Sequence, residues 1–229
     1  MARLLCRPYL CGGPRDCQES GERMDRRSFL LSASAYTLPI PSGDQMHFKV
    51  LRNGAAVGDH NIDFNQTGDD LTVSINASLL VTLAMIPIFR YSLKATERWS
   101  NGIFQTIDSA VDFNGSPLEV HAERTADGYN VRGTHVPSYL APLNTLPLTY
   151  WNKAMIQGTI LNIQTAHSYP VTVHSPGWNE VPTANAGPIV AQRFDLTGKL
   201  RMSIWYDRNN AWSRLEFQKG GDISYEKYV

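Results

Sequence analysis

Glu97 is the residue of this sequence best placed for acid–base chemistry. It alternates with Ala95 and Trp99, and alternate side chains of a strand point to one face, so Glu97 is predicted to face the apolar side of a sheet. Burial there would raise the pKa of its carboxyl group and make it a general acid or a group that orients a ligand. A structural ion pair with Arg90 or Arg98 at the end of the sheet is the alternative.

Large aromatic side chains form the second set of candidate binding residues. Each of them offers about 150–250 Å² of surface that can be buried. They are predicted to line a ligand cavity, or alternatively to fill the core of a β-protein. Together with the carboxylate, the candidate ligand-binding residues are Glu97, Trp99, Tyr150, Trp151, Trp205 and Tyr206.

The six histidines show none of the spacings of a metal site, because there is no H-E-x-x-H and no pair four residues apart. The nearest groupings are His121 with Glu123 on one strand face, and His167 with His174 across a turn. The sequence also lacks the nucleophile elbow of hydrolases and the glycine-rich loops that bind nucleotides. We therefore assign no catalytic residue, no metal and no cofactor.

Cysteine chemistry and attraction to nucleic acid are both disfavoured by composition. Cys6, Cys11 and Cys17 all lie in the first 17 residues, so the rest of the chain has neither a thiol nucleophile nor a disulfide. The 21 basic and 21 acidic residues give a formal net charge of zero. A nucleic-acid partner is therefore not expected.

Residues 1–45 are predicted to be an export signal with an over-extended start, outside the folded domain. Arg26 and Arg27 precede a short apolar stretch and an A-x-A-like cleavage site at residues 33–35, which is the pattern of a twin-arginine signal. Translation could begin at the first methionine or at Met24. The pattern predicts a periplasmic protein, and no stretch is apolar for the roughly 18 residues that a transmembrane helix needs.

Residues 46–229 are predicted to form a single antiparallel β domain. Apolar residues alternate with polar ones, and dipeptides such as Asn53-Gly54, Asn101-Gly102, Asn114-Gly115 and Asp127-Gly128 separate the extended runs. The alternation continues from Leu71 to Met85, so this strand must bend to fit a domain. Pro87 is predicted to mark a bend or a sheet edge. The fold class is therefore all-β, with a long curved antiparallel sheet forming a half-barrel or open barrel.

The segment from residue 135 to residue 150 is a proline-rich apolar loop. It is predicted to be either a lid or plug over a cavity or a crossover connection packed against the sheet. At most one or two short helices are expected, one of them over residues 149–156 with Thr149 as its N-cap. Asn152 and Asp207 are predicted to be turn or capping residues.

Short motifs in a fixed order resemble an uncharacterised family of exported bacterial β-proteins, classed as a domain of unknown function. The resemblance covers residues 46–229 and implies a half-barrel of the lipoprotein-carrier type, with no catalytic residues to carry over. The motifs are Glu97-Arg98-Trp99-Ser100-Asn101-Gly102, Tyr150-Trp151-Asn152, Ile163-Gln164-Thr165, Trp205-Tyr206-Asp207, Trp212, Leu215 and Tyr225.

Three function hypotheses remain open. The first is a periplasmic protein that binds or carries a hydrophobic ligand, a lipid or acyl compound, inside the curved sheet. The second is a structural or protein-interaction module of the cell envelope that meets a partner through a sheet edge. The third is an enzyme that uses Glu97 and a histidine as acid and base. A tightly packed interior would argue against the first, and an uncovered edge strand would favour the second.

Overall fold

The computed structural model describes residues 38–84 and 86–229. The predicted twin-arginine motif and cleavage site lie outside the described residues. Leu38 and Ile40 pack against the core, and the first strand begins at Gln45. No helix in the described part of the chain is long and apolar enough to cross a membrane.

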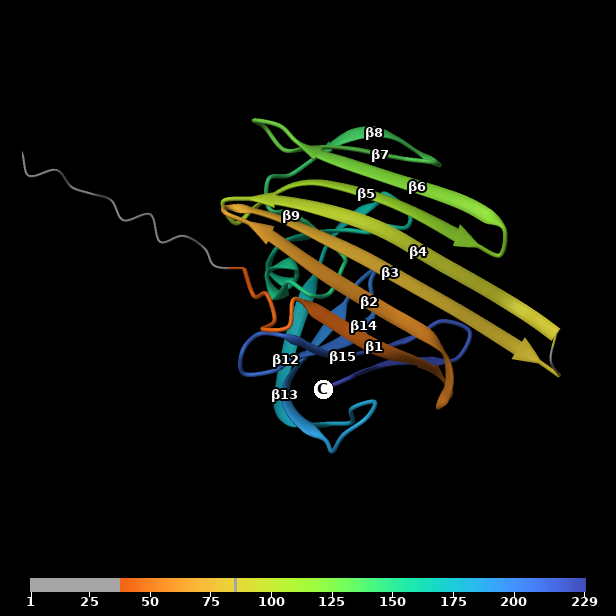
Figure 1. Ribbon diagram of the computed structural model, residues 1–229. Coiled ribbons are helices and arrows are strands. Elements are labelled where there is room, and N and C mark those ends of the chain that lie inside the picture. Colours follow the sequence, from red (N-terminus) through yellow and green to blue (C-terminus); the bar gives the residue numbers. More distant parts are fainter. Residues whose placement is uncertain (1–37, 85) are drawn as a thin grey trace, which may run out of the picture. The chain divides into compact units, whose positions relative to one another are not determined.

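Thirteen strands form one antiparallel sheet in the order β12-β13-β14-β15-β16-β1-β2-β3-β4-β5-β6-β7-β8. The sheet curves without closing, with β12 and β8 as its two edges, so the predicted open half-barrel is confirmed (Figure 1). Its strands are β1 (Gln45–Arg52), β2 (Ala55–Thr67), β3 (Asp70–Leu83), β4 (Ile86–Ser100), β5 (Ile103–Phe113), β6 (Ser116–Arg124), β7 (Tyr129–Gly133), β8 (Val136–Ala141), β12 (Thr172–Val181), β13 (Ile189–Thr197), β14 (Met202–Tyr206), β15 (Trp212–Gln218) and β16 (Asp222–Lys227).

The predicted hairpin turns connect neighbouring strands. Asn53-Gly54, Asn101-Gly102 and Asn114-Gly115 each adopt positive φ at both residues, which asparagine and glycine tolerate better than other residues. They join β1 to β2, β4 to β5 and β5 to β6, whereas Asp127-Gly128 lies in a looser loop before β7. Local sequence therefore fixes the meander of the first half of the sheet.

Strand β3 confirms the long alternating pattern over most of its length. Leu71, Val73, Ile75 and Ala77 are all buried on the concave face. The pairing of β3 with β4 shifts register beside Pro87, as expected for a residue that cannot donate a backbone hydrogen bond. The β3–β4 hairpin then projects beyond its neighbours, at the right of Figure 1.

The proline-rich segment is a crossover connection that fills the half-barrel. Its first part forms the edge strand β8, and residues 142–167, which we call the plug, run across the concave face towards the opposite edge strand, β12. The plug contains β9 (Thr145–Pro147), the 3-10 helix η1 (Lys153–Gln157) and β10 (Thr159–Leu161), and β11 (Ser168–Pro170) completes a small second sheet in the order β11-β10-β9. Its side chains belong to the same core as those of the main sheet. The apolar side chains of the plug that are buried most completely are Trp151, Met155, Ile160, Leu161 and Ala166.

The short helix is present, but its predicted start and cap were wrong. The Asn152 side chain caps η1 by accepting a hydrogen bond from the backbone N–H of Ala154 at 3.0 Å. Thr149 instead turns back towards the carbonyl oxygen of Pro147, and Tyr150 has a φ of 72°, which interrupts any helix that would begin earlier. The predicted capping role of Asn152 is confirmed. So is the turn role of Asp207, whose Oδ1 accepts hydrogen bonds from the backbone N–H groups of Asn209 and Ala211.

At Gly133 on β7 the sheet and the plug come so close together that there is no room for a larger side chain. A Cβ atom at this position would lie 2.4 Å from the Cβ of Ala166, which is fully buried. Ala166 has a φ of 60°, and its carbonyl oxygen accepts a hydrogen bond from the Tyr139 hydroxyl at 2.8 Å, so it has little freedom to retreat.

We therefore expect Gly133→Ala to lower the free energy of unfolding by about 1–3 kcal/mol, which is the usual cost of overpacking a core. Urea denaturation of the full chain would measure this loss. Gly187→Ala is the matched control, because no atom lies within 4 Å of the Cβ it would add. Equal stability of the two variants would contradict the close packing of plug and sheet.

Candidate functional site

Glu97 on β4 joins the sheet to the plug through two indole groups. Its side chain is completely buried, and its Oε2 accepts hydrogen bonds from Nε1 of Trp99 at 2.7 Å and from Nε1 of Trp151 at 3.1 Å. Trp99 lies on the same strand, whereas Trp151 comes from the plug. The carboxylate therefore connects two parts of the chain that are 54 residues apart in sequence.

Burial raises the pKa of Glu97 from its ordinary value of 4.5 to about 7, because a charge is poorly solvated inside the core. Contacts with Thr149, Trp99 and Trp151 oppose this rise by favouring the charged form. The other carboxyl oxygen, Oε1, makes no hydrogen bond of standard geometry within the described chain. The carboxyl group is therefore poised to gain or lose a proton near neutral pH.

The alternative ion pair between Glu97 and an arginine is not formed. Arg98 points to the opposite face of the sheet, where its guanidinium lies 3.5 Å from Asp108. Arg90 is exposed at the start of the projecting hairpin. Successive side chains of a strand alternate between faces, so neither arginine can reach the buried carboxylate.

Four of the five aromatic candidates, Trp99, Tyr150, Trp151 and Tyr206, lie in the interior, where they form two pairs. Trp99 and Trp151 meet edge to face with ring centroids 5.4 Å apart, beside Glu97. The second pair is joined by the Tyr206 hydroxyl, which donates a hydrogen bond to the carbonyl oxygen of Tyr150 at 2.8 Å. Trp99, Trp151 and Tyr206 are part of the packed core, and Tyr150 packs against it and also lines a small cavity described below.

Trp205 is also buried, at 3% exposure, but the structure does not bring it together with the other aromatic candidates. It packs with Val181 and Ala191 in a separate small cluster, and its Nε1 donates a hydrogen bond to Oδ1 of Asn179 at 2.9 Å. The physical reason is the alternation of a strand, which sends Trp205 and Tyr206 to opposite faces.

His60 is the interior residue that the sequence interpretation missed. It is 2% exposed on β2, and burial lowers its pKa to about 3, so its imidazole is neutral at physiological pH. Its Nε2 has no hydrogen-bond partner among the described residues. The sequence did indicate that His60 is buried, because it alternates with Ile62 and Phe64 on one face of the strand.

The interior next to His60 holds a cavity of about 20 Å³. That is room for one water molecule, since a buried water needs roughly 10–15 Å³. Binding pockets for small organic ligands usually measure about 300–1,000 Å³. The wall of this cavity is polar as well as apolar; its residues are His60, Ile75, Ala77, Tyr91, Leu93, Leu148, Thr149, Tyr150, Ile163, Gln164 and Tyr225.

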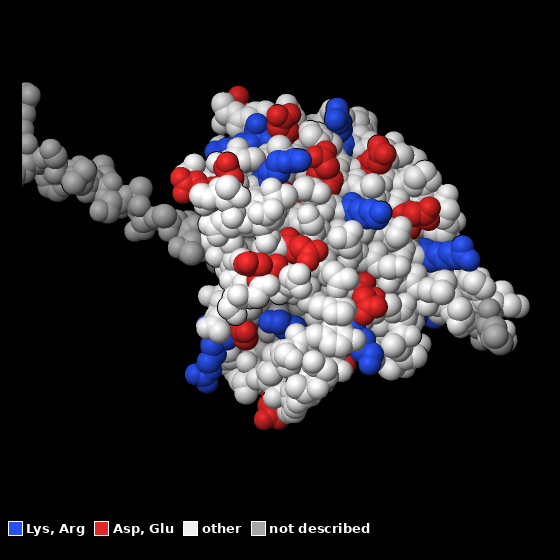
Figure 2. All heavy atoms as spheres, viewed as in Figure 1, with Lys and Arg blue, Asp and Glu red and all other residues white. Residues whose placement is uncertain are grey.

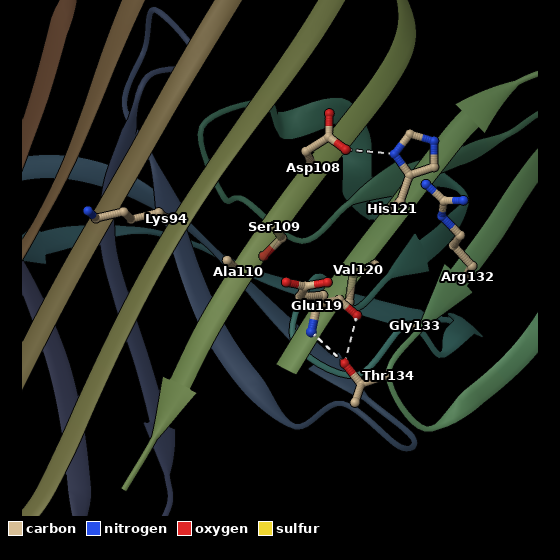
Figure 3. Close-up of a pocket in the computed structure, with 10 residues that line it drawn as sticks. All are labelled: Lys94, Asp108, Ser109, Ala110, Glu119, Val120, His121, Arg132, Gly133 and Thr134. Atoms are coloured by element: carbon tan, nitrogen blue, oxygen red, sulfur yellow. Dashed lines mark hydrogen bonds and ion pairs between the residues drawn. The ribbon is translucent and has the colours of Figure 1, made fainter. Parts of the chain in front are cut away.

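A larger groove, of about 590 Å³, lies over strands β4–β7 and is lined mainly by outward-facing side chains (Figure 3). Nδ1 of His121 lies 2.6 Å from Oδ1 of Asp108, and the amide N–H of Glu119 donates a hydrogen bond to the Thr134 hydroxyl at 2.7 Å. Charges of both signs line the groove, so it has no strong preference for an anion or a cation. The residues that line it are Lys94, Asp108, Ser109, Ala110, Glu119, Val120, His121, Arg132, Gly133 and Thr134.

Within residues 38–84 and 86–229, the structure does not pair Glu97 with a histidine, and it contains no metal centre. Glu97 accepts its hydrogen bonds from indoles, and no histidine of the described chain donates one to it. No three His, Cys, Asp or Glu side chains there converge in a way that could hold a metal ion. His121 and Glu123 do share one face, with Nε2 and Oε2 4.0 Å apart, whereas His167 stacks on Tyr169.

Two of the buried ionisable groups, Glu97 and His60, give opposite pH dependences of stability. Glu97 has a raised pKa, so between about pH 4.5 and 7 the folded state holds a proton that the unfolded state has lost, and stability falls as pH rises. His60 has a lowered pKa, so stability falls as pH drops from about 6.5 towards 3.

We expect Glu97→Gln to remove the first effect. Relative to the wild type, the variant should gain about 3 kcal/mol of unfolding free energy between pH 4.5 and pH 7, at 1.36 kcal/mol per pKa unit. Urea denaturation across this pH range would measure the difference. The exposed Glu119→Gln is the control. A difference between Glu97→Gln and wild type that does not change with pH would show that burial of Glu97 leaves its titration unaltered.

Comparison with known proteins identifies the family. No curated protein matches the chain. A family model described as a domain of unknown function, DUF6134, matches residues 48–227, which include the Glu97, Trp151 and Tyr206 motifs. The match confirms the resemblance seen in the sequence, and the chain belongs to the DUF6134 family.

Proposed function

We propose that this protein is an interaction module of the cell envelope that binds its partner through its outer surface. The observation that carries the proposal is the interior cavity of about 20 Å³, which accommodates a water molecule but not an acyl chain. The buried residues of the plug occupy the concave face that a hydrophobic ligand would otherwise fill. Binding must then use surfaces that are already exposed.

The edge strand β12 supports this proposal. It pairs only with β13, and most of its side chains are exposed, including Trp178 at 50%. An exposed edge offers unpaired backbone groups to an extended segment of a partner. A register shift between His174 and Gly177 divides the strand, so the regular edge available for pairing is the part from Gly177 to Val181.

Transport of a hydrophobic ligand inside the half-barrel is the second candidate function, and it requires the plug to move. The observation that favours it is a set of buried polar atoms of the sheet and the plug that have no hydrogen-bond partner among the described residues: Oε1 of Glu97, Nε2 of His60, Oγ1 of Thr145 and Nδ2 of Asn152. Each such atom costs about 1–3 kcal/mol, which weakens the packing between plug and sheet compared with a fully apolar one.

Organic extraction and mass spectrometry of the protein purified without detergent separate the two candidates. An interaction module with a filled interior should yield no stoichiometric lipid. A lipid or acyl species at one equivalent per chain would contradict the first proposal and support a carrier whose plug opens. Bovine serum albumin carried through the same purification and extraction controls for lipid adsorbed from the medium.

Export to the periplasm by the twin-arginine route is part of the same proposal and rests on Arg26 and Arg27. Lysine keeps the charge but loses the planar guanidinium that recognition of a paired-arginine signal uses. The double variant Arg26→Lys and Arg27→Lys should therefore remain in the cytoplasm, as measured by cell fractionation and immunoblotting. Arg7→Lys with Arg15→Lys is the matched control. Normal export of the Arg26/Arg27 variant would contradict the route.

A further inference from the structure

The hairpin of β3 and β4 ends in an apolar projection that has no neighbouring strand on either side. Strand β2 pairs with β3 only as far as Leu79, and β5 pairs with β4 only from Tyr91 onward. Between these limits the two strands pair solely with each other, from Leu80 opposite Arg90 to Leu83 opposite Ile86. We call the described residues of this projection, 80–84 and 86–89, the tip. A two-stranded hairpin of this kind is only marginally stable in water by itself.

The tip is uncharged, and several of its apolar side chains are strongly exposed. Residues 79–89 contain no ionisable side chain, and Thr82 is their only polar residue. Ile86, Ile88 and Leu80 are 65%, 52% and 47% exposed, and they are among the most exposed large apolar side chains of the described protein. In Figure 2 the described atoms at the end of this projection are white. An apolar patch of this kind marks a binding surface for another molecule or a membrane.

Apolar side chains on both faces of the tip favour insertion into an apolar medium over docking on a flat partner. Residues of opposite parity, such as Leu80 and Val81, point to opposite faces of a hairpin. A single protein surface can cover one face, whereas a lipid bilayer covers both faces and the end together. Four paired residues extend about 13 Å, which is less than half of a hydrocarbon core of about 30 Å.

Three basic residues lie near the base of the tip. Arg90 follows the tip directly and is exposed. The Lys219 ammonium lies 4.9 Å from the ring centroid of Phe113, whose ring in turn packs against Phe89 at 5.2 Å. Arg52 is beside them, donating a hydrogen bond to the carbonyl oxygen of Gly220.

Acidic residues at this end of the sheet are already engaged. Asp112 accepts a hydrogen bond from the backbone N–H of Gly115, and Asp222 accepts one from the Gln218 side chain. Asp59, which lies in the same row of the sheet as Asp112, is engaged too, with its Oδ1 3.2 Å from Nε2 of His47. Arg90 follows the tip directly, so it is the charged side chain best placed to meet an anionic head group.

We propose that the tip inserts into one leaflet of an anionic phospholipid bilayer, with Arg90, Lys219 and Arg52 at the head-group level. The inference rests on the proposed outer-surface function and names its partner. Insertion removes the exposed isoleucine and leucine surface from water while leaving the packed core of the half-barrel unchanged.

Flotation of the full chain with vesicles of phosphatidylethanolamine and phosphatidylglycerol tests the proposal. The double variant Ile86→Ser and Ile88→Ser should lose about tenfold or more in vesicle partitioning, because two half-exposed side chains no longer enter lipid. Leu140→Ser with Leu143→Ser is the matched control, with exposures of 53% and 47% outside the tip, and should partition as the wild type does. Both double variants keep the apolar N-terminal segment, so its contribution cancels.

Three outcomes would overturn the inference: a wild-type chain that does not float, equal loss in both double variants, or a tip-dependent dimer in solution by light scattering with no vesicle binding. Thermal unfolding of each variant checks folding, and the tip variant should melt with the wild type because its changes lie outside the core. A failed flotation would leave the interaction-module proposal standing, since that fails only if stoichiometric lipid is extracted from the interior.

Discussion

The structure depends on covering the concave apolar face of a curved sheet with a segment of the same chain. A sheet that curves through thirteen strands without closing leaves its inner face open to water. The plug removes that surface from water and links the two edge regions of the sheet, from β8 to β12. The hydrophobic effect is the driving force, and the hydrogen bonds of Glu97 to two indoles fix which part of the plug meets which strand.

The polar groups inside this core carry a cost that apolar residues would not. Glu97 and His60 are both buried and are both driven towards their neutral forms, one by a raised pKa and the other by a lowered pKa. Because the two shifts act in opposite directions with pH, the contributions of these two groups to the pH dependence of stability oppose each other in the range where they overlap. The buried polar groups therefore specify how the plug packs on the sheet, but they make the core less stable than a fully apolar core would be.

In the function we propose, the interior is filled and three outer surfaces are the candidates for binding. They are the free edge of β12, the mixed-charge groove over β4–β7, and the projecting hairpin of β3 and β4. These surfaces differ in chemistry. The edge of β12 offers backbone hydrogen-bonding groups, the groove offers charged side chains of both signs, and the hairpin offers exposed apolar side chains. A module anchored by its apolar hairpin would present the other two to partners.

The sequence by itself determined the all-β class, the asparagine–glycine turns, the buried face of β3 and the inward direction of Glu97, because these depend on local φ preferences and on the two-residue period of a strand. The same two-residue period also predicts that Trp205 and Tyr206 point to opposite faces of the sheet, and that His60 points inward with Ile62 and Phe64. Only the tertiary structure decided that the proline-rich segment fills the half-barrel, that Trp151 and not an arginine meets Glu97, and that the β3–β4 hairpin outruns its neighbours. Those contacts join residues far apart in the chain, and their geometry follows from how the sheet curves, which no local pattern specifies.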